Sequence, residues 1–138
     1  KLKITTAVIH VELGKTLKPI LKTFRHHHIQ VLLAINPRTP TAKIKPWVSS
    51  VHGLMVMGVF PGRYGAAWQS RTIKKLLTLH RQYPRLLLST DGGVSNKNIQ
   101  SLVKAGAKQL IVGSSIQKHQ SPQRAFRQFA TLAAAAKK

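Results

Sequence analysis

The stretch that decides the fold is Leu86-Leu87-Leu88-Ser89-Thr90-Asp91-Gly92-Gly93-Val94, a short apolar run that ends in an aspartate and two glycines. Four further apolar runs of strand length show little polar alternation, which is typical of strands buried on both faces of a parallel sheet. They cover residues 4–11, 29–35, 51–60 and 109–112. The sequence therefore predicts five parallel strands, of which 86–90 is the fourth.

Amphipathic stretches separate these runs and predict helices. The predicted helices cover residues 15–25, 73–80, 96–105, the segment after Ser121-Pro122 and, more weakly, 41–48, which contains Pro46. Tyr83-Pro84 ends the second helix, because proline disfavours helix in the residue before it. Ser95 is the predicted N-cap of the third helix and Gly106 its end. The alternation predicts one α/β domain over residues 1–138 with no internal boundary, either a doubly wound sheet or a barrel.

The charge balance is unusual for such a domain. The chain has 138 residues and 43% hydrophobic residues, but 23 Lys and Arg face only 2 Asp and Glu, for a formal net charge of +21. Such a surface attracts polyanions. The chain has no cysteine, which excludes disulfides and thiolate metal sites. No apolar run reaches the roughly 18 residues that a membrane span requires, and we expect a location in the cytoplasm or an organelle matrix.

Four motifs at the ends of the predicted strands choose between the two architectures. In order and spacing they resemble motifs of the ribulose-phosphate 3-epimerase family, and His10-Val11-Glu12 is similar to that family's fourth-strand segment. The four motifs are Ala34-Ile35-Asn36-Pro37-Arg38-Thr39-Pro40, Met55-Val56-Met57-Gly58-Val59-Phe60-Pro61-Gly62, Asp91-Gly92-Gly93-Val94 and Gly113-Ser114-Ser115-Ile116. The resemblance implies a (β/α)8 TIM barrel with its site at the C-terminal ends of the strands. This chain would supply strands four to eight.

The resemblance also implies residue roles. It makes Asp91 a proton-transfer group and a ligand of a divalent metal ion; the alternative is a turn aspartate that accepts local backbone hydrogen bonds. It implies a phosphate-binding cradle, for which the alternative is ordinary turn glycine. The predicted phosphate-binding residues are Gly65, Gly92, Gly93, Gly113 and Ser114.

Two further residues resemble positions of the substrate pocket. Met57 is similar to the methionine that shields the reaction intermediate, and His10 is similar to a pocket-lining position, although a histidine there is more often a satisfied core residue. In the loop that follows Gly62 the chain departs from the family pattern, and there Arg63 is either a phosphate contact or one more solvated cation.

The implied activity is epimerisation at C3 of a pentulose 5-phosphate. The family's remaining histidines and second aspartate belong to strands upstream of Lys1, so we expect a fragment or processed form that does not epimerise alone. Closing the barrel would need an N-terminal segment, a second copy or a partner. The alternative function is a non-catalytic RNA-binding component of a ribonucleoprotein particle, suggested by charge alone. A third explanation for the shortage of acidic residues is an altered sequence.

Overall fold

The computed structural model describes residues 3–62 and 65–136. Strands and helices alternate along the chain. The strands are β1 (Thr6–His10), β2 (Gln30–Ile35), β3 (Gly53–Met57), β4 (Leu87–Asp91) and β5 (Gln109–Ile111). The helices are η1 (Val11–Thr16), α1 (Leu17–His26), η2 (Thr41–Ser50), α2 (Arg71–Gln82), α3 (Ile99–Lys104), α4 (Ser114–Gln117) and α5 (Pro122–Ala135), with η marking 3-10 helices. No helix in these two ranges combines the length and apolarity of a membrane span.

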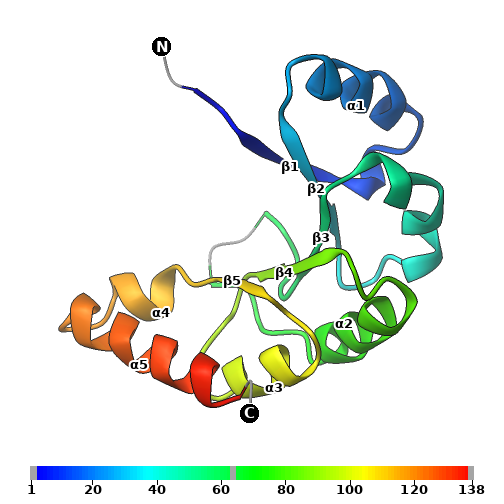
Figure 1. Ribbon diagram of the computed structural model, residues 1–138. Coiled ribbons are helices and arrows are strands. Elements are labelled where there is room, and N and C mark those ends of the chain that lie inside the picture. Colours follow the sequence, from blue (N-terminus) through cyan, green and yellow to red (C-terminus); the bar gives the residue numbers. More distant parts are fainter. Residues whose placement is uncertain (1–2, 63–64, 137–138) are drawn as a thin grey trace.

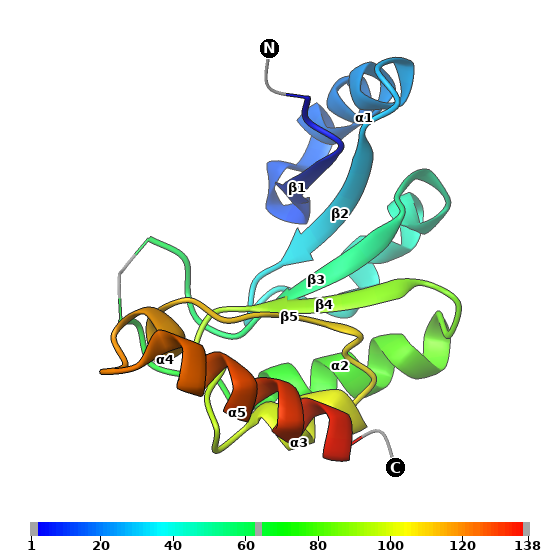
Figure 2. The ribbon, with the colours of Figure 1, turned by 60° about the vertical axis from the view of Figure 1, so that its left-hand side comes forward.

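The five strands form one parallel sheet in the order β1-β2-β3-β4-β5, so every strand pairs with its successor in the chain. Figure 2 shows them fanned side by side, with α2, α3 and α5 together along one side. A doubly wound sheet reverses its strand order at a switch point. The sequential order here instead matches consecutive units of a (β/α)8 barrel, in which right-handed crossovers place all helices on one face.

The two faces of the sheet bury different clusters. The larger cluster joins the helices to alternate strand residues, among them Leu33, Val56 and Leu88. The smaller cluster on the opposite face consists of Leu32, Ala34, Met55 and Met57, with Leu87 packed against it. Burial on both faces explains why the strands lack polar alternation.

One predicted helix start needs correction. α3 begins at Ile99 rather than near residue 96, and its N-cap is Asn98, not Ser95. Before the helix, residues 95–98 form a turn in which the Ser95 carbonyl accepts from the Asn98 N–H and the Ser95 N–H donates to Asn98 Oδ1 over 2.8 Å. Ser121 occupies the N-cap of α5, as predicted, but its hydroxyl makes no capping bond.

The weak helix around Pro46 is the 3-10 segment η2, which the missing proline N–H explains. The sequence analysis missed η1 and α4. Both are too short to display a helical repeat of apolar residues. As predicted, α2 ends just before Tyr83-Pro84, and Gly106 follows α3 with a φ of 99°.

Candidate functional site

The predicted phosphate-binding residues follow two adjacent strands at the same edge of the sheet. Asp91 at the end of β4 pairs with Met57 of β3 and with Ile111 of β5. Gly92 and Gly93 come directly after β4, and Gly113-Ser114 comes two residues after Ile111. The two loops are joined by a hydrogen bond of 2.8 Å from Ser115 Oγ to the Val94 carbonyl. Four of the five predicted positions therefore lie on neighbouring loops (Figure 1).

Backbone conformation and packing require glycine at some positions of these loops and not at others. Gly92 and Gly93 have φ values of 90° and 68°, and a Cβ on Gly92 would lie 2.6 Å from the Val59 side chain. Backbone conformation and packing already demand glycine there. Gly113 has a φ of −98° and no atom within 4 Å of its ideal Cβ position. No packing contact among the described residues demands glycine at this position, so space remains beside its Cα.

Gly65 is the fifth predicted position. Its φ of 75° favours glycine, and none of the described residues beyond its chain neighbours lies within 4 Å of its Cβ position. Arg63, the other predicted contact of this loop, lies outside the described residues.

An asparagine missed by the sequence analysis holds the loop after β4. Asn98 is 9% exposed. Its Nδ2 donates to the Gly93 carbonyl over 2.9 Å, while its Oδ1 accepts from the Ser95 N–H. The side chain thus ties the second glycine to the start of α3. An asparagine five residues after a glycine turn is not a distinctive enough pattern to reveal such a role.

Asp91 is partly exposed at the end of β4. Its main-chain carbonyl accepts from the Gly58 N–H over 2.7 Å. A Cβ on Gly58 would lie 2.1 Å from the Gly92 carbonyl oxygen, so the strand ends approach as closely as glycine allows. The Asp91 carboxylate forms no hydrogen bond or ion pair with any residue in 3–62 or 65–136. Among the described residues it therefore does not act as a local turn acceptor.

Met57 lies beside Asp91 in register and is 9% exposed in the smaller cluster. Met55, two residues earlier, belongs to the same cluster. Both sulfurs thus line the face of the sheet opposite the helices. That is the inner face of a barrel, where the predicted pocket would lie.

His10 and Glu12 lie at the other end of this edge, on and just after β1. His10 Nδ1 is 3.2 Å from Glu12 Oε2, and the histidine side chain is 35% exposed, so it is not a core histidine. Glu12 Oε1 accepts from the Asn36 N–H over 2.9 Å. Burial opposes ionisation of Glu12, but hydrogen bonds, led by those of Thr39 and Asn36, outweigh it and lower its pKa. β2 and β3 separate His10 from Asp91.

Lys75 of α2 is a second residue that the sequence did not reveal. Its Nζ donates to three carbonyl oxygens of the turn after β2, those of Asn36 (2.7 Å), Pro37 (3.1 Å) and Thr39 (2.5 Å). Burial lowers the pKa of the Lys75 ammonium group. The Glu12 carboxylate raises this pKa in part, and the Arg71 cation lowers it further. The only spacing signal would be a lysine on the buried side of an amphipathic helix.

The described residues do not form a metal centre. No group of three or more His, Asp or Glu in 3–62 and 65–136 is placed to hold an ion. Asp91 could give one ligand, and the acid nearest to a histidine, Glu12, already accepts bonds at both oxygens. The donor set of this chain therefore does not fit a divalent ion by itself.

Comparison with known proteins supplies the family. The profile of the Ribulose-phosphate 3 epimerase family matches residues 1–117. The chain belongs to this family. It is 30% identical over 114 residues to ribulose-phosphate 3-epimerase of Schizosaccharomyces pombe, covering 83% of this chain and 50% of that protein. It is 33% identical over 112 residues to the enzyme of Helicobacter pylori strain 26695, covering 78% and 52%.

Membership confirms the family prediction, and the chain spans about half the length of these curated relatives. Among solved structures, orotidine 5'-monophosphate decarboxylase from Sulfolobus solfataricus superposes with a TM-score of 0.75 at 16% identity. The match covers 97% of this chain and 63% of that one. This likeness confirms the predicted fold: the strands and helices of the chain form part of a TIM barrel.

Proposed function

We propose that this epimerase-family chain binds a sugar phosphate at the C-terminal ends of β4 and β5. The backbone amides of Gly92, Gly93, Gly113 and Ser114 would receive the phosphate, with Gly65 at its margin. The observation that carries the proposal is the pairing of Asp91 with Ile111, which sets both glycine loops on adjacent strand ends. Amides at such ends are a common phosphate site in barrels.

Asp91 is the proposed proton-transfer group. Its carboxylate accepts no bond from the described residues and stands beside Met57 at the inner face. Epimerisation removes a proton from one side of a carbon and returns one to the other, which calls for two acid–base groups. Glu12, the second carboxylate of the chain, is bound to His10 and Asn36. We therefore expect this chain to bind pentulose 5-phosphate, with His10 and Met57 at the pocket wall, without epimerising it alone.

A divalent metal ion is a family expectation for which Asp91 would give one ligand, and no step of the proposal passes through it. A homo-oligomer or a partner segment that completes the barrel also stays a prediction, as does the cytoplasmic or organelle-matrix location. The alternative function, RNA binding by a protein that keeps the scaffold without its chemistry, rests on the net charge of +21.

A pair of variants at one position tests the phosphate site. Ser114→Pro removes one N–H donor at the first residue of α4, where proline is tolerated. Ser114→Ala keeps the N–H and removes only the hydroxyl. Calorimetric titration with D-ribulose 5-phosphate at constant ionic strength should show an affinity loss on the order of tenfold for Ser114→Pro, since hydrogen bonds to charged groups contribute about 1.5–3 kcal/mol. Equal affinity of the two variants would overturn the cradle.

Proton transfer is tested separately. In D2O, NMR should show no exchange at C3 of ribulose 5-phosphate with this chain alone, despite binding. Exchange that disappears in Asp91→Asn would confirm the role of Asp91 and overturn the expected inactivity. Exchange that survives in Asp91→Asn would overturn the role itself.

A further inference from the structure

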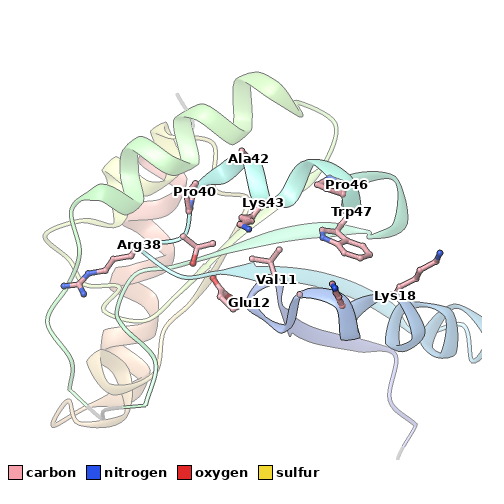
Figure 3. Close-up of a pocket in the computed structure, with 12 residues that line it drawn as sticks. Val11, Glu12, Lys18, Arg38, Pro40, Ala42, Lys43, Pro46 and Trp47 are labelled. Carbon is pink, nitrogen blue, oxygen red and sulfur yellow. The ribbon is translucent and has the colours of Figure 1, made fainter.

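A groove of about 940 Å³ lies at the other end of the sheet edge from the glycine loops. Figure 3 shows it between η1, which follows β1, and η2, which follows β2. Because β1 and β2 are separated from β4 and β5 by β3, the groove is distinct from the proposed phosphate cradle. Its volume is at the upper end of the range of ligand pockets, about 300–1,000 Å³.

Cations border this groove. Lys15 and Lys18 come from the η1–α1 side, and Arg38 and Lys43 come from the β2–η2 side. All four side chains belong to exposed residues. In Figure 3, Arg38 lies at one end, Lys43 near the middle and Lys18 toward the other end, so the charges follow the length of the groove. A line of cations fits a line of anionic groups better than it fits one phosphate, which would need donors that converge.

The single acid of the lining, Glu12, offsets only one of these four charges. Glu12 is bound to His10 Nδ1 through one oxygen and to the Asn36 N–H through the other. Its carboxylate thus joins the ends of β1 and β2 by hydrogen bonds. The lining of the groove has four cations and one anion, so an excess of positive charge remains.

The wall of the groove is apolar. Val11 is 5% exposed, Trp47 is half-buried, and Pro46 adds an exposed apolar ring. Trp47 packs against the larger core cluster, which holds the indole in place. A fixed indole beside a row of cations combines the two features that bind single-stranded nucleic acid, an aromatic platform for a base and positive charge for the backbone.

We propose that this groove binds a single-stranded nucleic acid segment, with Trp47 stacking on a base and the four cations along the phosphates. The inference goes beyond the sugar-phosphate function and does not depend on it. The net charge of +21 favours a polyanion over a mononucleotide, because each further phosphate releases counterions. Recognition would be of backbone and bases in general, without a fixed sequence.

Matched charge variants test the location. The groove variant replaces Lys15, Lys18 and Lys43 with Gln. The control variant replaces Lys74 of α2, Lys104 of α3 and Lys108 with Gln; all three are exposed and do not line the groove, so the net charge changes equally. Binding of a fluorescent twelve-residue oligouridine is measured by anisotropy against salt concentration.

The groove variant should lose at least about tenfold in affinity at 0.1 M salt and lower the log-log salt slope by about 2, from roughly 0.7 for each lost phosphate contact. The control variant should lose less than about threefold. Equal losses in the two variants, or no binding of the oligonucleotide to the unaltered protein, would overturn the proposal.

Tryptophan fluorescence tests whether Trp47 stacks on a base. Trp47→Phe keeps an aromatic ring and leaves Trp68 as the second tryptophan of the two in the chain. Oligouridine should quench the fluorescence of the unaltered protein and leave that of Trp47→Phe nearly unchanged. Three results would each contradict a groove that binds a nucleic acid strand. The first is undiminished quenching in Trp47→Phe, and the second is uridine monophosphate binding as tightly as the oligonucleotide. The third is stronger binding to phosphatidylglycerol vesicles that depends on the same lysines.

Discussion

Replacing Lys75 with Met should destabilise the protein far more than replacing its neighbour Lys74. Lys75 Nζ donates to three carbonyl oxygens at the end of β2, at 2.7, 3.1 and 2.5 Å. Met keeps the apolar stem and removes the donors. The exposed Lys74 is the matched control, because it lies on the same helix and carries the same charge.

The magnitude follows from these bonds. Hydrogen bonds to charged groups contribute about 1.5–3 kcal/mol each when buried, but water can reach part of this half-buried site, so about 2–3 kcal/mol in total is expected. An unfolding entropy of about 2.1 cal/mol/K per residue, over 138 residues, is about 0.29 kcal/mol/K. The Tm of Lys75→Met should therefore fall by about 7–10 °C.

Thermal unfolding followed by circular dichroism at constant salt gives this value. Lys74→Met should change the Tm by less than about 2 °C, or raise it slightly by relieving repulsion among the 23 cations. If the two variants melt together, the three carbonyl bonds do not stabilise the turn, and the reasoning from their geometry is wrong.

Four other substitutions probe the same edge of the sheet. Gly58→Ala should cost about 2–4 kcal/mol in chemical denaturation, because its Cβ would lie 2.1 Å from a carbonyl oxygen, whereas Gly113→Ala, with nothing within 4 Å, should be nearly neutral. Glu12→Gln should lower the free energy of unfolding by less than about 1 kcal/mol. Folding lowers the pKa of Glu12 from its ordinary 4.5, so the stability difference from wild type should be full above pH 4.5 and should disappear as the pH falls through the folded-state pKa. Chemical denaturation at several pH values measures this difference. Asn98→Ala should lower the free energy of unfolding by about 2 kcal/mol, because the loop after β4 loses both side-chain hydrogen bonds. Calorimetry should also show weaker binding of ribulose 5-phosphate, and unchanged affinity would mean that this loop does not contact the ligand.

The fold could be predicted from local patterns because each strand is a continuous apolar run. All five strands lie where the runs predict them, and the boundaries differ by a few residues. The errors fall where side chains compete with local preference. Ser95 is a good N-cap by type, yet residues 95–98 form a turn closed by the Asn98 side chain, and α3 begins only at Ile99. That outcome depends on the geometry of the turn, which a helix-start pattern does not contain.

The candidate site divides in the same way. Gly92 and Gly93 stand out in the sequence because the backbone there needs glycine, and their motif could be matched directly. The roles of Lys75 and Asn98 depend on groups 36–39 and 5 residues away that only folding brings near. The sequence shows how basic the chain is. It does not show that folding places Lys15, Lys18, Arg38 and Lys43 around one groove with Trp47.

The sequential strand order has a consequence for how the chain acquires its structure. Each of the four pairings in the sheet joins segments that are neighbours along the chain, so closing each loop costs little entropy. All four pairings are parallel, so each still has to wait for its crossover segment, and parallel sheets fold more slowly than helical bundles. During synthesis, each strand from β2 to β5 can pair with the strand made just before it, and the sheet can grow one unit at a time.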